Sequence, residues 1–263
     1  MLGVGVRRAP LSIEREHTMD SGFYAACAGL RAQSQALDVA AHNVANVSTT
    51  GFRSQHASFQ TLLALARPAA SNPLNLSINN YGVLEGSRLD LSSGSLQATG
   101  NPLDVGIEGK GFFAIQTPQG MRYTRDGSFR VARTGELVTA AGNPVLGENG
   151  VLRVPSGDLS ISSDGTLSVN GAVAGKIRQV EFAPETKLTS DGDALLSAPT
   201  GSERPARETS IRQGMLESSN VDAIHAVITL IGVQREAEMM QRALSLFHTE
   251  FNRIAANDLP RVS

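Results

Sequence analysis

The sequence is short of the residues that most often cross-link a chain, build an aromatic core or span a membrane. Cys27 is the only cysteine among 263 residues, so the chain cannot form an internal disulfide or a cysteine-based zinc site. Tryptophan is absent, and aromatic residues make up 5% of the chain. No stretch approaches the roughly 20 apolar residues that a transmembrane helix requires. These shortages argue against a disulfide-stapled domain and against insertion into a membrane.

Charge of either sign is also limited. Lysine and arginine number 23, aspartate and glutamate number 25, and the formal net charge is −2. No basic cluster breaks this balance, so nothing in the sequence favours a nucleic acid or an anionic lipid as partner. We therefore expect no nucleic-acid partner.

Groups that could hold a metal or a phosphate do not converge in the sequence. None of the five histidines has a second histidine or a carboxylate at the spacing that metal ligands show. The run "GIEGKGFF" (106–113) is similar to a phosphate-binding loop, but that motif needs four residues between its glycines and here there are two. The run is better explained as a tight turn. We predict no metal site and no cofactor.

Four carboxylates in the middle of the chain raise the alternative of a glycoside hydrolase, which uses a pair of such groups. They are Asp104, Glu108, Asp126 and Asp164. Asp126 and Asp164 each precede a glycine and a strand-like run, which gives them roles in turns. No serine nucleophile motif is present either. We therefore predict no catalytic residues and no small-molecule substrate, and the chain is not expected to be an enzyme.

Heptad spacing, in contrast, is abundant at both ends of the chain. A seam of mostly small residues runs through the N-terminal segment as Phe23, Cys27, Leu30, Ser34, Leu37, Ala41 and Val44. A longer seam runs through the C-terminal segment as Ala223, Ala226, Leu230, Val233, Ala237, Met240, Leu244, Phe247, Phe251 and Ile254. A second apolar row, Val221, Ile224, Ile228 and Ile231, is expected to widen the first half of this surface. Two rows suggest more than one neighbouring helix.

Between the helices the hydrophobic period changes to that of strands. Short apolar or alternating runs, among them "GFFAIQT" (111–117), "MRYTR" (121–125) and "KIRQVEF" (176–182), are separated by glycine, proline, asparagine and aspartate. We expect an α+β fold in which long N- and C-terminal helices pair as a coiled coil, with an antiparallel all-β domain inserted between them.

The expected organisation follows from these patterns. Residues 1–18 form a disordered tail or an upstream extension of the reading frame, and 19–55 form the N-terminal helix and its motif. An extended linker covers 56–99 and a β domain covers 90–212. The C-terminal helix covers 213–257, and a tail covers 258–263.

The stretch "AAHNVANVSTTGFRSQ" (40–55) ends the first helix in an unusual way. Asn43 and Asn46 lie three residues apart and so share one helix face. Thr49 offers a hydroxyl to the freed carbonyls, Gly51 permits a left-handed turn, and Phe52 follows as an apolar anchor. Such a helix end suits a crowded helical interface, in which amides fix the register, although an ordinary polar helix end stays an alternative.

Three separate motifs in the same order resemble those of the flagellar axial proteins. They are "HNVANVSTTGFRSQ" (42–55), "GNPLDVGIEGKGFFAIQTPQGMRYTRDGSFRVARTGELVTAAGNPVLG" (100–147) and "QGMLESSNVDAIHAVITLIGVQREAEMMQRAL" (213–244). Size and the compact middle are similar to the basal-body rod proteins of the FlgF/FlgG type, and the start "MDSGFYAA" favours FlgF. The sequence departs from the family where "LESSN" replaces the usual "LEGSN", and 1–18 has no counterpart.

The resemblance implies a structural subunit of the rod, which self-assembles through its terminal helices into a hollow drive shaft that transmits torque across the periplasm. Its partners would be itself, other rod subunits and the flagellar type III export apparatus, which exports subunits without a cleaved signal peptide. A hook or distal-rod paralogue stays an alternative, as does, from a different class, a periplasmic wall-degrading enzyme. The residues expected at the assembly interface are Leu30, Leu37, Asn43, Val44, Asn46, Thr49, Gly51, Phe52, Leu230, Val233, Met240, Leu244, Phe247, Phe251 and Ile254.

Overall fold

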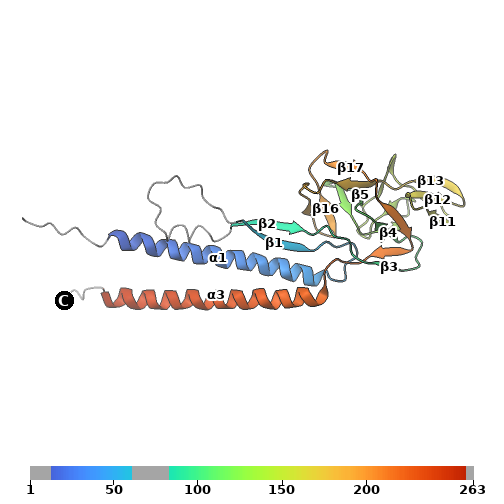
Figure 1. Cartoon of the computed structure of the whole chain (residues 1–263). Coiled ribbons are helices and arrows are strands. Elements are labelled where there is room, and N and C mark those ends of the chain that lie inside the picture. Colours follow the sequence, from blue (N-terminus) through green and yellow to red (C-terminus); the bar gives the residue numbers. More distant parts are fainter. Residues whose placement is uncertain (1–12, 61–82, 259–263) are drawn as a thin grey trace, which may run out of the picture. The chain divides into compact units, whose positions relative to one another are not determined.

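The structure is a computed structural model that describes residues 13–60 and 83–258 (Figure 1). The expected tail at 258–263 lies almost wholly outside the described residues, as does most of the expected 1–18 segment. The chain divides into two compact units, which are taken separately below. One unit holds most of both helices together with residues 57–87, and the other holds 41–56 and 88–227. The boundaries expected from the sequence stay a prediction.

The helical unit contains most of α1 (Ile13–Ala45) and α3 (Ala223–Asp258), which have 33 and 36 residues. A direct link between them is made by Gln33, whose side-chain amide donates to the carbonyl of Val233 over 2.9 Å and to Glu236 over 3.0 Å. A two-stranded ribbon of β1 (Gln55–Gln60) and β2 (Val83–Leu89) begins in this region. No helix among the described residues combines the length and the apolar character needed to cross a bilayer.

The expectation of two long terminal helices paired as a coiled coil is wrong. Most elements of the described chain are strands, and α1 and α3 do not form a long coiled-coil pair. Among the α1 residues whose side chains the structure describes, Ala36 and Ala40 are buried, whereas Ser34 and Ala41 of the expected seam are exposed. Small residues occur on all sides of α1, so its buried positions need not follow the heptad spacing that a coiled coil requires.

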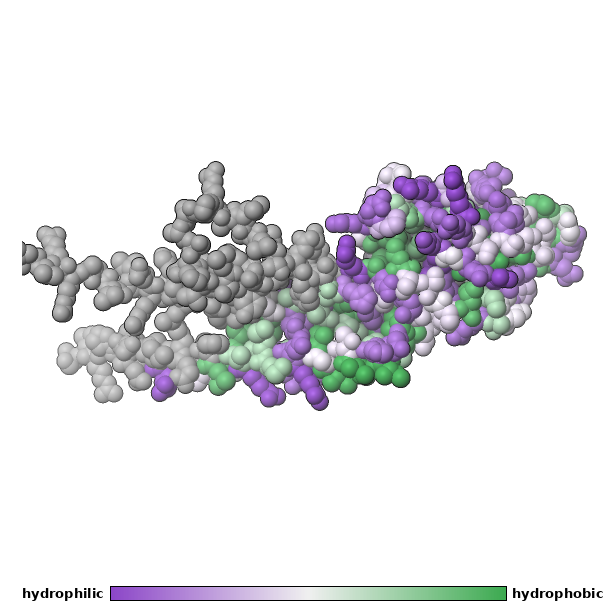
Figure 2. Space-filling view, in the orientation of Figure 1, coloured by the Kyte–Doolittle hydropathy of each residue, from purple (hydrophilic) through white to green (hydrophobic). Residues whose placement is uncertain are grey.

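The two apolar rows of α3 lie on opposite faces of the helix. Residues two positions apart in an α-helix lie about 200° apart around its axis. Ile228 and Leu230 therefore point to opposite sides of α3. The structure agrees, because Leu230 is half-buried while Ile224 and Ile228 are 72% and 62% exposed. The sequence predicted that the second row would widen the first, but it forms a separate exposed face instead. Hydrophobic residues gather along the beginning of α3 in Figure 2.

The other unit is built around a six-stranded antiparallel sheet with the strand order β15-β16-β6-β5-β14-β17 (Figure 1). Its central hairpin joins β5 (Phe112–Thr117) to β6 (Gly120–Thr124), with Phe113 opposite Thr124 and Thr117 opposite Gly120. The remaining strands of this sheet are β14 (Gln179–Phe182), β15 (Thr189–Ser190), β16 (Leu195–Ser197) and β17 (Glu203–Pro205).

Smaller antiparallel sheets complete this unit. Three strands form one of them, in the order β11 (Leu159–Ile161), β12 (Thr166–Val169) and β13 (Ala172–Lys176). The others are pairs: β3 (Leu96–Ala98) with β19 (Met215–Glu217), β4 (Val105–Glu108) with β18 (Ser210–Gln213), β7 (Arg130–Val131) with β8 (Leu137–Val138), and β9 (Leu146–Gly147) with β10 (Gly150–Val151). β19 leads directly toward α3, so the C-terminal motif is anchored by a strand before the helix begins.

Two apolar clusters form the core of the β unit. The larger packs residues such as Phe113, Ile115 and Leu167, each fully buried, and the rings of Phe113 and Phe129 meet edge-on at 5.1 Å. The smaller gathers Phe112, Tyr123 and their neighbours. Successive side chains of β5 enter different clusters, with Phe113 and Ile115 in the larger and Phe112 and Ala114 in the smaller, so this central strand is buried on both faces.

Candidate functional site: the motif junction and the exposed face of α3

The first asparagines of the N-terminal motif close the end of α1 within the chain. The side-chain amide of Asn46 donates to the carbonyl of His42 over 2.9 Å, and Thr49 donates to the Asn46 side-chain oxygen over 3.1 Å. Asn43 brackets the backbone of Gln55, donating to its carbonyl over 2.7 Å and accepting from its N–H over 2.9 Å. These contacts satisfy groups that a helix end leaves free, and they fold the chain back onto the last turn of the helix.

Gly51 and Phe52 then fix the path of the chain. Gly51 has φ +66°, and a Cβ atom at this position would lie 2.2 Å from the backbone nitrogen of Asp126, so only glycine fits. Its N–H donates to the carbonyl of Glu217 over 2.8 Å. Phe52 is buried, with its ring edge-on to His42 at 5.3 Å. The motif is therefore shaped to approach the backbone of two other segments closely.

A buried ion cluster lies beside this turn. Glu217 accepts from Arg53 over 2.7 Å through one carboxylate oxygen and from Arg125 over 3.1 Å through the other, and these three side chains are at most 1% exposed. The backbone N–H of Gly94 donates to the same oxygen as Arg53, over 2.7 Å. Removing one partner of a buried ion pair costs about 3–5 kcal/mol, because the other charge stays buried without compensation.

Arg125 shows how strongly this site is desolvated. Its second guanidinium nitrogen donates to the carbonyl of Gly109 over 2.7 Å, and the guanidinium lies over the ring of Phe112 at 4.8 Å. Burial lowers the pKa of Arg125 to about 10, with Glu217 opposing this effect and the nearby Arg53 adding to it. The cluster therefore holds two cations and one anion.

Asn220 ties the C-terminal motif to two further segments. Its side-chain oxygen accepts from the N–H of Ser54 over 2.7 Å, and its amide donates to the carbonyls of Asp90 and Ser92 over 3.0 and 3.1 Å. Burial acts to raise the pKa of Asp90, but hydrogen bonds from Ser92 outweigh it and the pKa is lowered. Asn220 thus binds both the N-terminal motif and the segment around 90–92 at the start of the β unit.

Arg53, Arg125 and Glu217 could not be recognised from the sequence as partners, and Asn220 was expected only as a possible cap of the C-terminal helix. Arg53 and Glu217 are 164 positions apart, and Arg125 and Glu217 are 92 apart. No local pattern links charges at such separations. The available signal was the placing of "FRS" and "LESSN" inside the two terminal motifs, where charged residues would otherwise be expected to face solvent.

The predicted interface residues fall into three groups. Asn43, Asn46, Thr49, Gly51 and Phe52 make the contacts within the chain described above. The helical residues Leu30, Leu37, Val44, Leu230, Val233, Met240 and Leu244 are half-buried. The side chains of Phe247, Phe251 and Ile254 lie outside the described residues. Whether any of these residues contacts a neighbouring subunit stays a prediction.

The carboxylates considered for hydrolysis have separate structural partners. Asn101 donates to Asp104 over 2.9 Å, and Arg212 donates to Glu108 over 2.9 Å. Asp126 accepts from Thr50 over 2.7 Å, and Asp164 accepts from Thr166 over the same distance. Among the described residues no group of three or more metal-binding side chains converges.

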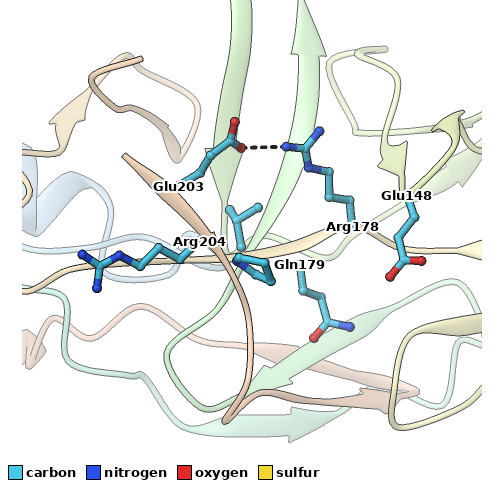
Figure 3. Close-up of a pocket in the computed structure, with 7 residues that line it drawn as sticks. Glu148, Arg178, Gln179, Glu203 and Arg204 are labelled. Carbon is cyan, nitrogen blue, oxygen red and sulfur yellow. Dashed lines mark hydrogen bonds and ion pairs between the residues drawn. The ribbon is translucent and has the colours of Figure 1, made fainter. Parts of the chain in front are cut away.

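One pocket of about 280 Å³ opens beside β14 and β17 (Figure 3). Glu203 on its wall accepts from Arg178 over 2.9 Å and from the hydroxyl of Tyr123 over 3.2 Å. Burial and the Glu203 carboxylate together raise the pKa of Tyr123 to about 12. Glu148 lies on the far side of the pocket from Glu203 in Figure 3, so its two carboxylates do not converge.

Comparison with known proteins matches the three motif regions one by one. Residues 23–53 match the model described as flagella basal body rod protein, and 212–248 match the flagellar basal body rod FlgEFG protein C-terminal model. Residues 106–169 match the flagellar hook protein FlgE/F/G D1 domain. A flagellar basal-body rod protein FlgF of Caulobacter vibrioides is 32% identical over 90% of this chain and 98% of that protein. The chain belongs to the flagellar basal-body rod protein family.

Further rod-protein relatives agree with this result. FlgF of Escherichia coli is 34% identical over 86% of this chain and 94% of its own length, and FlgG of Borreliella burgdorferi is 32% identical over 92% and 100%. The resemblance noted in the sequence is thereby confirmed, with the FlgF type supported. As a rod protein the chain is a structural subunit of the bacterial flagellar basal body, where it interacts with other subunits of the rod.

The residues of the junction come from all three regions that match the rod-protein family. The matched N-terminal region ends at Arg53, and the matched C-terminal region includes Glu217. In this rod protein the two regions meet at the buried ion cluster, while the matched D1 region supplies Arg125. The three matched regions therefore contribute one side chain each to the same site.

Proposed function

We propose that this rod protein assembles by burying the exposed face of α3 against helices of neighbouring subunits. The observation that carries the proposal is the exposed row Ile224, Ile228 and Ile231 of α3, whose side chains are 46–72% exposed. Val221, which precedes the helix in this row, is half-buried. A soluble protein rarely leaves a contiguous row of large aliphatic residues in water without a partner for it. Fully burying one such side chain contributes about 1.5–3 kcal/mol, so the row supplies a substantial driving force for association.

The half-buried seam on the opposite face of α3 gives the helix a second contact. Leu230, Val233, Met240 and Leu244 lie on this face, and the predicted Phe247, Phe251 and Ile254 continue its spacing. Leu30, Leu37 and Val44 of α1 are the proposed counterparts. A helix with two apolar faces joins two neighbours, and head-to-tail contacts that do not close on themselves generate a helical filament such as a shaft.

The amide and turn residues of the N-terminal motif belong to the same proposal in an indirect role. Asn43, Asn46, Thr49, Gly51 and Phe52 shape the end of α1 and so fix where its apolar residues stand. The finer parts of the proposal rest on the family resemblance. They are torque transmission across the periplasm, export through the type III apparatus without a cleaved signal peptide, and a purely structural, non-enzymatic role. A chain with no internal disulfide suits export in an unfolded state.

The substitution Ile228→Asp tests the proposal. A charge in the exposed row of the rod protein should reduce incorporation into rods by at least about tenfold, because a buried carboxylate without a partner costs several kcal/mol. The measurement is the amount of variant in purified basal bodies, together with swimming of cells that carry it as their only copy. The free energy of unfolding of the soluble chain should stay unchanged.

Gln234→Asp is the matched control, since Gln234 is an exposed polar residue of the same helix and the change adds the same charge. It should assemble normally. Normal rods with Ile228→Asp would show that this face of α3 is not a subunit contact.

A further inference from the structure

The apolar core of the β unit is complete without the two terminal motifs. Every residue of its two apolar clusters, including the partly buried ones, lies between Leu89 and Ile211. The N-terminal motif (46–56) and the C-terminal motif (215–222) supply none of them. These two clusters therefore stabilise the sheet without a contribution from either motif, and Phe52 is a buried apolar residue of the N-terminal motif outside them.

Polar contacts to Glu217 and Asn220 join the two motifs to each other. Glu217 binds Arg53 of one motif, Arg125 of the β unit and the N–H of Gly94 through its carboxylate. Its backbone carbonyl accepts from Gly51. Asn220 accepts from the N–H of Ser54. Arg53 and Glu217 are 164 positions apart, and Ser54 and Asn220 are 166 apart. These two contacts, like that of Gly51 with the Glu217 carbonyl, form only when both motifs are present.

The cluster is also not built for maximal stability. Two guanidinium groups share one carboxylate, and Nε and Nη1 of Arg53 and Nε of Arg125 have no hydrogen-bond partner within the described chain. Loss of the carboxylate would leave two like charges buried beside each other. Buried ion clusters of this kind stabilise less than an apolar substitute but strongly disfavour any arrangement in which a partner is missing.

We propose that Glu217 is an electrostatic latch, which orders the N-terminal motif only when the C-terminal motif is docked beside it and which opens without unfolding the β core. The two motifs thus form a cooperative unit of their own, separate from the sheet on which they rest. Glu217 acts as a positioning residue for the loop 49–54. The proposal concerns the free chain and does not depend on how subunits pack.

Amide hydrogen exchange on the full-length soluble chain with Glu217→Gln tests the latch. The amides of Gly51 and Ser54 are the reporters, because their acceptors, the Glu217 backbone carbonyl and the Asn220 side chain, both remain in the variant. Faster exchange of these two amides therefore reports opening of the loop 49–54, because the substitution does not remove their hydrogen-bond acceptors. We expect exchange at these amides to accelerate at least about 100-fold, while amides of the β5–β6 hairpin keep their protection.

The control Glu108→Gln removes a carboxylate from the exposed pair with Arg212 and should leave both sets of amides unchanged. Equal loss of protection in the hairpin, or failure of Glu217→Gln to fold, would show that the cluster belongs to the β core and would overturn the latch. Unchanged exchange at Gly51 and Ser54 would overturn it as well.

A double variant separates electrostatics from packing. Glu217→Gln leaves two uncompensated cations, and adding Arg53→Met removes one of them. We expect the double variant to recover about tenfold of the protection lost at Gly51 and Ser54 by Glu217→Gln alone. If the double variant instead lost the sum of the protection lost in the two single variants, Glu217 and Arg53 would act as independent packing residues. That result would contradict the latch.

Discussion

The β unit and helix α3 treat their large apolar side chains in opposite ways. In the β unit Phe113 and Ile115 are fully buried. In α3 Ile224, Ile228 and Leu246 are between 62% and 72% exposed. The difference shows that the β unit buries its largest apolar side chains within a single chain, whereas α3 leaves several of its own in water. A subunit of a multi-copy shaft is expected to combine a unit that folds on its own core with a helix whose apolar surface is buried only by neighbouring subunits.

The largest expected effect concerns the buried core of the β unit. Phe113→Ala should lower the free energy of unfolding of the soluble chain by about 3–5 kcal/mol, because the site loses a fully buried ring and gains a cavity. Denaturant titration followed by far-UV circular dichroism measures it. Ile228→Ala, on the exposed face of α3, should change the same quantity by less than about 0.5 kcal/mol. Equal costs at the two positions would erase the contrast between the units.

A second prediction concerns the backbone of the N-terminal motif. Gly51→Ala should destabilise the chain by at least about 2 kcal/mol, since it forces a left-handed conformation on alanine and places Cβ against the backbone of Asp126. Gly142→Ala is the matched control, with φ +85° and no atom within 4 Å of the new Cβ. It should cost about 1 kcal/mol, from the conformation alone. A cost at Gly51 no larger than at Gly142 would mean that the close approach is not constraining.

The smallest effect concerns Tyr123, which has a polar hydroxyl inside the second apolar cluster of the β unit. Because its pKa is raised to about 12 in the folded chain, the neutral phenol is favoured by folding. Its contribution is fully present below about pH 10, the ordinary tyrosine pKa, and is lost as the pH rises toward 12. Tyr123→Phe should cost about 0.5–1.5 kcal/mol at neutral pH and less at higher pH.

Absorbance titration near the tyrosinate band provides the measurement for this site. The folded chain has three tyrosines, and one of them should titrate near pH 12. The Phe variant should lack this step. A Tyr123 that titrates at its ordinary pKa would show that its hydroxyl is solvated. The second apolar cluster of the β unit would then contain no buried hydroxyl at this position.

Much of the architecture could be predicted from the sequence, because periodicity is a local property. Helix α3 covers its predicted heptad positions from Ala223 through Ile254, and "GFFAIQT" contains β5. The register of burial on α1 was missed, since Ala36 and Ala40 are buried while the predicted Ala41 is exposed. Small residues on all sides of a helix give no contrast from which to choose a face.

The candidate site was only half predictable for a related reason. Gly51 could be recognised as a turn residue, because the requirement for positive φ is expressed at that position alone. The carboxylate of Glu217 could not be matched to Arg53, since in a sequence with 23 basic residues every acidic residue has many possible partners. Burial decides between them, and burial is a property of the assembled fold.

The sequence by itself determined the family, the two amphipathic terminal helices and the strand-rich middle, because motifs and hydrophobic periods depend on neighbours within a few residues. Only the tertiary structure decided that the terminal motifs meet at one buried carboxylate and that the two apolar rows of α3 have different environments. Those outcomes depend on which distant segments exclude water from each other, and that exclusion exists only once the chain has folded.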